Sequence, residues 1–222
     1  MNYRHISNLK PVADYMADAL LHHLTSGQRV SWLIGGGSGI DISLQVAASL
    51  REAGVSLANL SVTLTDERYG ALGHTDENWQ QLLDRGFSLP GAKLYRVLNG
   101  QDRATTTHQF SAVLHALLDD TDYSLGFFGI GADGHTAGIK PGSPAVTAED
   151  YAAAFTGPDF ERITMTGPAI EQLNEAVIYA VGADKQPVLH QLLTETVPVN
   201  DQPAQLLKAV TKSTLFTDLK EG

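Results

Sequence analysis

Short apolar segments alternate with amphipathic segments along most of this chain, and this alternation limits the folds that it can adopt. Residues 30–34 form an apolar run, followed by a glycine loop and a helical stretch that ends near Gly54. The same order of strand, loop and helix returns downstream. Alternation of this kind favours a mostly parallel central sheet with helices on both faces, a Rossmann-like α/β architecture.

Periodicity and apolar runs predict the remaining elements. We expect helices over residues 9–26, from 78 onward, 105–118, 168–173 and 185–193, and strands within 60–70, 123–131, 161–167 and 176–182. Residues 142–159 show no period, which predicts an irregular surface loop. The chain contains no internal repeat and no low-complexity segment, so we expect residues 1–222 to form one domain.

The composition is that of an ordinary globular protein, with 43% hydrophobic and 18% charged residues. The formal net charge is −10 and none of the 15 Lys and Arg residues form a run, which argues against a nucleic-acid surface. A small anionic ligand is compatible with this total, because a few cations focused in a cleft outweigh the net charge. We therefore expect a small-molecule partner and no nucleic acid.

Other features of the sequence limit the compartment and the chemistry. No apolar stretch approaches the length of a membrane span, and the N-terminal segment lacks the apolar core of a secretory signal. We expect no membrane contact, a cytoplasmic location, and a monomer or small homo-oligomer. The absence of cysteine excludes disulfides, a thiol nucleophile and a Cys-ligated metal site.

Ligands of open α/β sheets bind beyond the carboxyl ends of the strands, so the loops that follow strands carry the candidate residues. Three such loops have unusual sequences: "GGGSGI" at 35–40, "TDERYG" at 65–70 and "GIGADGHTAG" at 129–138. The first offers flexible backbone before a helix N-terminus, which suits a phosphate, and a plain tight turn is an equally good interpretation. It lacks the endings of nucleotide and dinucleotide loops, which disfavours ATP and NAD.

The first loop alone does not explain anion binding. Asp41 would lie in the first turn of the following helix and repel a phosphate, so a cation is needed from elsewhere. Arg68 is a candidate because its guanidinium forms a fixed fork for oxyanions. The alternative is a structural ion pair of Arg68 with Asp66 or Glu67, and the local sequence favours that alternative.

The third loop carries the candidate base. His135 is the residue there that can exchange protons near neutral pH, and Asp133 lies close enough in sequence to orient the imidazole. The alternative is a structural histidine. The chain has no Gly-x-Ser-x-Gly elbow and no histidine pair at zinc spacing, which leaves a hydrolase or isomerase that uses a general base without covalent or metal help. We expect no cofactor.

Six segments that extend over most of the chain occur in a recognisable order: "GGGSGI", "DERYGALGHTDENW", "GIGADGHTAGIKPGS", "RITMTG", "VGADKQPVL" and "QPAQLL". In this order they resemble the landmarks of the 6-phosphogluconolactonase and glucosamine-6-phosphate deaminase superfamily. The resemblance implies that His135 activates water for attack on a lactone carbonyl, with Asp133 nearby. It also implies a phosphosugar substrate whose binding residues are Gly37, Ser38, Gly39, Asp66, Arg68, Asn78, Arg162 and Lys185.

Within the superfamily, the resemblance favours a lactonase that hydrolyses 6-phosphogluconolactone. Lactonases carry Arg at the position of Arg68, and deaminases carry Tyr there. Deaminases also carry Glu at the position of Lys140, where lactonases usually have an aromatic or apolar residue, and Gly39 and Ile40 replace the usual Thr-Pro. Two alternatives stay open: a deaminase or isomerase with Asp66 as the base, and a phosphosugar-binding protein without catalysis.

Overall fold

The computed structural model describes residues 1–219 and confirms the expected α/β architecture. A central sheet of seven parallel strands has the order β1-β10-β9-β6-β2-β3-β5. Its strands are β1 (Asn2–His5), β2 (Val30–Ile34), β3 (Leu60–Leu64), β5 (Lys93–Leu94), β6 (Tyr123–Gly129), β9 (Glu175–Tyr179) and β10 (Lys212–Thr217).

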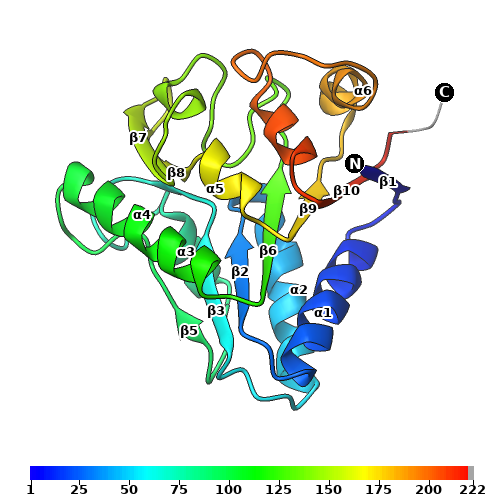
Figure 1. Ribbon diagram of the computed structural model, residues 1–222, viewed down its shortest axis with the longest axis vertical. Coiled ribbons are helices and arrows are strands. Elements are labelled where there is room, and N and C mark those ends of the chain that lie inside the picture. The colour runs from blue at the N-terminus through cyan, green and yellow to red at the C-terminus, as the bar shows by residue number, and fades with distance from the viewer. Residues whose placement is uncertain (220–222) are drawn as a thin grey trace.

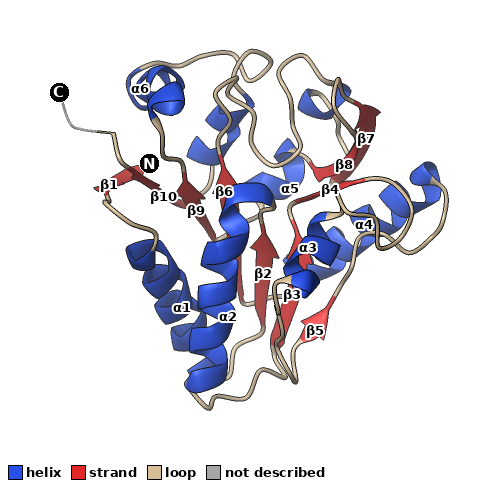
Figure 2. Ribbon diagram, turned by 180° about the vertical axis from the view of Figure 1, so that it is seen from behind, coloured by secondary structure: helices blue, strands red, loops and turns tan. Residues whose placement is uncertain are grey.

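Helices cover both faces of this sheet. Figure 1 shows α4 and α5 in front of the strands, and Figure 2 shows α1 and α2 on the opposite face. The helices are α1 (Lys10–Thr25), α2 (Ile40–Glu52), α3 (Asn78–Asp84), α4 (Arg103–Asp119), α5 (Gly167–Glu171) and α6 (Gln186–Thr194). Short 3-10 helices span Gly37–Gly39, Pro144–Val146, Ala183–Lys185 and Pro203–Lys208.

A second, antiparallel sheet lies beside the carboxyl ends of the parallel strands (Figure 1). Its order is β4-β8-β7, with β4 (Asp66–Arg68), β8 (Glu161–Met165) and β7 (Ala152–Thr156). Residues 161–167 are therefore a strand as expected, but one of this second sheet. The expectation of an irregular loop over 142–159 is wrong, because β7 and a 3-10 helix lie within it.

The central strands are buried on both faces, as parallel strands between two helical layers must be. Every residue of β2 is buried, and Trp32 is fully buried between the sheet and its covering elements. Ser31 satisfies its buried hydroxyl by donating to the carbonyl oxygen of Leu117 at 2.9 Å. This packing holds the ends of β2, β3 and β6 in register, and those ends carry the three loops of interest.

The two sheets share one hydrophobic core. Leu33 in the parallel sheet and Ile163 in the antiparallel sheet belong to the same cluster of buried residues, and both are fully buried. Burying side chains of this size stabilises the fold by about 1.5–3 kcal/mol each. Because the two sheets share this core, the antiparallel sheet is packed against the parallel one.

Among residues 1–219, no helix combines the length and apolarity needed to cross a membrane.

Candidate active site

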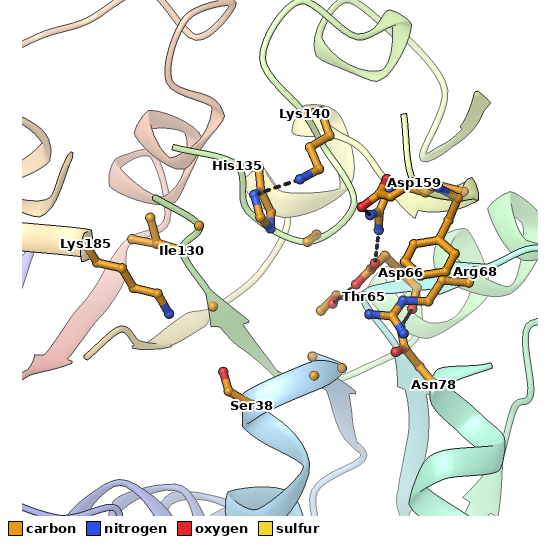
Figure 3. Close-up of a pocket in the computed structure, with 18 residues that line it drawn as sticks. Ser38, Thr65, Asp66, Arg68, Asn78, Ile130, His135, Lys140, Asp159 and Lys185 are labelled. Carbon is orange, nitrogen blue, oxygen red and sulfur yellow. Dashed lines mark hydrogen bonds and ion pairs between the residues drawn. The ribbon is translucent and has the colours of Figure 1, made fainter. Parts of the chain in front are cut away.

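A cavity of about 370 Å³ lies at the carboxyl ends of β2, β3 and β6, between the two sheets. Six segments of the chain line it, and Figure 3 shows their side chains directed toward a common space. The lining residues are Gly35, Gly36, Gly37, Ser38, Thr65, Asp66, Arg68, Asn78, Gly129, Ile130, Gly131, His135, Ala137, Lys140, Asp159, Phe160, Arg162 and Lys185.

The glycine loop after β2 forms one wall of the cavity. Gly37 has a φ of 62°, a left-handed conformation that glycine adopts at no steric cost, and it opens the 3-10 helix that leads into α2. A Cβ atom at Gly36 would overlap the side-chain amide of Asn78, so the loop and α3 approach as closely as only glycine permits. Gly37 and Ser38 line the cavity, whereas Gly39 is buried against the ring of Phe127.

Asp41 does not face the cavity. It lies in the first turn of α2 as expected, but its carboxylate accepts a hydrogen bond from the guanidinium of Arg85 at 3.0 Å. Both side chains are largely exposed. The anticipated repulsion between Asp41 and an anion in the glycine loop is therefore reduced by this surface ion pair.

His135 lines the cavity, and Asp133 holds its imidazole ring from outside. Oδ1 of Asp133 lies 2.5 Å from Nδ1 of His135 and also accepts from the backbone N–H of His135 at 3.1 Å. Partial burial raises the pKa of the Asp133 carboxyl, but the hydrogen bond and charge of His135 outweigh burial and hold that pKa at about 2. With Nδ1 donating to this carboxylate, Nε2 keeps a lone pair and can accept a proton.

Lys140 contacts the same pair. Its ammonium nitrogen lies 3.2 Å from Oδ2 of Asp133 and 3.3 Å from Nδ1 of His135. The side chain is only 20% exposed, and Figure 3 shows it directed toward the imidazole from the wall of the cavity. Asp133 therefore uses one oxygen for the histidine and the other for the lysine.

Arg68 and Arg162 come together through the antiparallel pairing of β4 with β8, where they are directly opposite residues. The ring of Phe160 lies 4.9 Å from the guanidinium carbon of Arg68 and 5.4 Å from that of Arg162. Within residues 1–219, no carboxylate lies at ion-pair distance from Arg68, and its Nη1 donates instead to the carbonyl of Asp76 at 3.0 Å. The expected ion pair of Arg68 with a neighbouring acid is therefore wrong.

Two carboxylates face Arg162. Oδ2 of Asp159 accepts from Nη2 at 2.6 Å, and Oδ2 of Asp66 lies 3.9 Å from Nη1. Burial raises the pKa of Asp66 above its ordinary value, although the charges of Arg162 and Arg68 oppose this. Burial also raises that of Asp159, but there the charge of Arg162 prevails and the pKa is lowered. The buried Arg162 is thus paired from both sides in the described chain.

Glu67 joins the Arg68 segment to the start of α3. Its carboxylate is fully buried and accepts from the backbone N–H groups of Arg68, Asn78 and Trp79 at 2.8, 2.6 and 3.0 Å. Burial raises the pKa of Glu67 to about 8, against the effect of these three donors. Asn78 in turn donates from Nδ2 to the carbonyl of Asp66 at 3.1 Å, so it braces the wall of the cavity that it lines.

Lys185 enters the cavity from the opposite side (Figure 3). It is the residue just before α6, and in the described part of the chain no carboxylate lies within ion-pair distance of its ammonium group. The cavity therefore contains the cationic groups of Arg68, Arg162, Lys140 and Lys185, in a chain whose net charge is −10. A cleft of this kind concentrates anions in spite of the total charge.

The structure brings together eight of the ten residues proposed from the sequence. His135, Gly37, Ser38, Asp66, Arg68, Asn78, Arg162 and Lys185 line the cavity. Asp133 lies behind His135, in the wall of a neighbouring depression with Val188 and Gln202, and Gly39 packs against Phe127. Within residues 1–219, no group of three His, Asp or Glu side chains is arranged to hold a metal ion.

Sequence reasoning missed the roles of Lys140, Asp159 and Phe160 in the cavity wall. Lys140 is an unusual residue for its position in the sequence, but only the structure shows that its ammonium group contacts Asp133. Asp159 and Phe160 lie in the hairpin between β7 and β8, which the sequence did not predict. Only the prediction of that hairpin would have placed them opposite Arg68.

The arrangement combines an oriented imidazole with an anion-binding wall. A neutral imidazole whose Nδ1 is held by a carboxylate can take a proton from water through Nε2. The cationic side chains on the other walls can bind a phosphate or a developing oxyanion. Chemically, the cavity suits addition of water to an activated carbonyl of an anionic substrate.

Comparison with known proteins identifies relatives over nearly the whole chain. Residues 7–216 match a family model described as glucosamine-6-phosphate isomerases/6-phosphogluconolactonase. Probable 6-phosphogluconolactonase 1 of Arabidopsis thaliana is 26% identical over 213 residues, which cover 88% of this chain and 79% of that protein. The 6-phosphogluconolactonase of Chlamydia muridarum is 26% identical over 133 residues, or 58% of this chain and 51% of that protein.

The extent of the match differs between relatives, and the chain spans about half the length of the two chlamydial relatives, 51% and 49%. Among solved structures, that of a devB protein has a TM-score of 0.82 at 21% identity, covering 97% of this chain and 95% of that one. A monomeric glucosamine-6-phosphate deaminase has a TM-score of 0.81 at 18% identity, covering 98% and 97%. These structures confirm the fold and do not discriminate between activities.

Proposed function

The chain belongs to the glucosamine-6-phosphate isomerase/6-phosphogluconolactonase family, and from this we propose that it hydrolyses 6-phosphogluconolactone to 6-phosphogluconate. The observation that carries the proposal is the Asp133–His135 pair, with the imidazole lining a cavity that also holds four cationic side chains. The names of the curated relatives support the same reaction. Phosphosugar chemistry of the family also supports a small-molecule substrate.

His135 acts as the general base in the proposed mechanism. Nε2 takes a proton from water while the water oxygen bonds to the lactone carbonyl carbon. The bond from that carbon to the ring oxygen then breaks, and the imidazolium returns the proton to this oxygen, leaving a carboxylic acid that ionises and a free hydroxyl. Such general base catalysis contributes about 10²–10⁴-fold, and a δ-lactone is activated enough to need no covalent intermediate.

The other walls of the cavity would position the phosphate. Figure 3 shows Ser38, Arg68 and Lys185 apart from His135, and Gly37 and Arg162 line the same cavity. Binding energy from this remote group would hold the carbonyl against His135 and the water. The cytoplasmic location and the monomeric or small homo-oligomeric state stay predictions from the sequence.

The competing activity is deamination of an amino sugar phosphate, and Asp66 is the observation in its favour. This buried carboxyl lines the cavity, and burial raises its pKa, a property that suits a proton-abstracting base. Lys140 counts against it, because deaminases carry an acid at this position. Release of ammonia from glucosamine 6-phosphate, abolished in an Asp66→Asn variant, would favour the deaminase over the lactonase.

The test is hydrolysis of freshly generated 6-phosphogluconolactone, followed against its spontaneous background. We expect acceleration by the wild-type protein and loss of about 10²-fold or more in kcat for His135→Ala. His108→Ala is the matched control, because His108 is an exposed histidine of α4 away from the cavity. Tight binding of 6-phosphogluconate without acceleration by the wild type would instead indicate a binding protein without catalysis.

A further inference from the structure

Lys140 has no role in the mechanism above, yet its ammonium group touches both members of the proposed base. It lies 3.2 Å from Oδ2 of Asp133 and 3.3 Å from Nδ1 of His135. The backbone around it is fixed as well. The backbone carbonyl of Lys140 accepts a hydrogen bond from the N–H of Ser143 at 3.0 Å. Two residues after Lys140, the N–H of Gly142 donates to the backbone carbonyl of Asn200 at 2.9 Å.

We propose that Lys140 is a positioning residue, which locks Asp133 onto His135 and opposes the charge of this carboxylate at the imidazole. This inference rests on the proposed function, because it assigns Lys140 to the same general base. It does not require contact between Lys140 and the substrate.

The first part of the proposal follows from the geometry of the Asp133 carboxylate. Oδ1 accepts from the ring and the backbone of His135, and Oδ2 faces the ammonium of Lys140. With both oxygens engaged, rotation of the carboxylate would break a charge-assisted contact on either side. The imidazole plane is thereby held at one angle to the cavity.

The second part follows from the sign of the charge. A cation close to an imidazole disfavours the protonated ring, and a carboxylate favours it. The ammonium of Lys140 and the carboxylate of Asp133 therefore act on the ring with opposite sign. The other charged or titratable groups that face the loop lie on several elements: Asp66 and Arg68 in β4, Asp159 before β8, Arg162 in β8, Lys185 before α6, and His190, Glu195 and Asp201 around the neighbouring depression.

The ammonium approaches the imidazole at Nδ1, whereas the proposed chemistry takes place at Nε2. A positioning residue and a substrate-binding residue make different predictions in this geometry. Loss of positioning changes kcat and the pH dependence and leaves KM nearly constant. Loss of a substrate contact raises KM and leaves the pH dependence unchanged.

The experiment compares Lys140→Met, which keeps the length and removes the charge, with Lys140→Arg, which keeps the charge. The first readout is the NMR titration of the His135 ring in the protein without substrate, assigned with His135→Ala. We expect its midpoint to move to higher pH by about half a unit or more in Lys140→Met, and to stay near wild type in Lys140→Arg. An unmoved midpoint in Lys140→Met would overturn the proposal.

The second readout is the pH profile of lactone hydrolysis. We expect the acid limb of kcat/KM to move upward in Lys140→Met by the same amount as the ring titration, with KM within about twofold of wild type. Lys185→Met is the contrasting variant, because Lys185 shares the cavity but has no contact with Asp133 or His135 in the described residues, and it should raise KM without moving the limb. A large rise in KM with an unmoved limb in Lys140→Met would overturn the positioning role.

The two readouts separate failure of this inference from failure of the proposed function. A wild-type protein that does not accelerate lactone hydrolysis would contradict the proposed function alone, and the ring titration would still decide whether Lys140 acts on His135. Acceleration by the wild type with an unmoved ring titration in Lys140→Met would leave the lactonase standing and reject the role of Lys140.

Discussion

The carboxylate of Asp159 forms an ion pair with the guanidinium of Arg162 in the wall of the cavity, where Oδ2 accepts from Nη2 at 2.6 Å. Arg162 is one of the cations to which we assign phosphate binding. An acidic side chain of the protein thus lies where the negative charge of the substrate is expected. It competes with an incoming anion for the same donors, and it adds a repulsion that the anion must overcome.

Removal of this charge should tighten anion binding. We expect Asp159→Asn to lower the Kd of inorganic phosphate by about two- to fivefold at low ionic strength, as for loss of a partly exposed charge interaction. Isothermal titration calorimetry measures the change. Glu161→Gln is the matched control, because Glu161 lies on the same hairpin but pairs with Arg103 outside the cavity. Equal or weaker phosphate binding by Asp159→Asn would contradict the competition.

Gly131 determines the position of the Asp133–His135 pair by leaving room for it. A Cβ atom here would overlap Nδ1 of His135 and lie 2.6 Å from Oδ1 of Asp133. The backbone of Gly131 has no positive φ, so alanine would displace these two side chains without straining the backbone. We expect Gly131→Ala to keep its circular dichroism spectrum and to lose about 10²-fold in kcat, the lower range of general base catalysis. Steady-state kinetics on the lactone gives this value.

The comparison for that variant is Gly129→Ala. Gly129 is the last residue of β6, two residues before Gly131, and an added Cβ atom there would approach nothing closer than the carbonyl oxygen of Tyr179 at 4.0 Å. We expect a far smaller loss of kcat than for Gly131→Ala. Similar losses in the two variants would indicate that the loop tolerates no alanine, and that displacement of the imidazole is not the cause.

Glu67 predicts a pH-dependent stability. Burial raises its pKa in the folded protein from 4.5 to about 8, so between these values folding is accompanied by uptake of a proton. The contribution of Glu67 to the free energy of unfolding is therefore complete below pH 4.5 and declines as the pH rises toward 8. Glutamine does not titrate, and it replaces one acceptor oxygen by a donor that faces a backbone N–H.

We expect Glu67→Gln to lower the free energy of unfolding by about 1–3 kcal/mol near pH 5, because a buried N–H loses its acceptor. The difference from wild type should narrow as the pH approaches 8, as measured by urea unfolding at a series of pH values. Glu52→Gln removes the same charge at an exposed position at the end of α2 and should show no such trend. A difference that stays constant between pH 5 and 8 would mean that Glu67 is ionised throughout this range.

Much of the site could be predicted from local sequence. The strands at 30–34 and 123–129 are recognisable as apolar runs, and in a parallel sheet the loops after them must lie at one edge. That is why Ser38 and His135, which are far apart in sequence, were expected in one site. Weak strands were missed: β1 is mostly exposed and β5 has two residues, so neither carries a hydrophobic pattern.

The hairpin over the cavity could not be predicted, because nothing in residues 142–159 has a period. The structure pairs β4 with β8 in antiparallel register, and this pairing makes Arg68 and Arg162 neighbours. It also brings Asp159 and Phe160 into the wall. The expected ion pair between Arg68 and Glu67 is absent because the carboxylate of Glu67 turns inward and accepts from the backbone N–H groups at the start of α3. This contact too depends on segments that are distant in sequence.

Local periodicity and the residue types next to strand ends are enough to predict the α/β class, the glycine loops and the candidate base. The partners of the charged side chains, Asp159 on Arg162 and Lys140 on Asp133 and His135, follow only from the folded arrangement. Strand formation is governed by neighbours in sequence, whereas an ion pair depends on distances of a few ångströms between segments that only folding brings together.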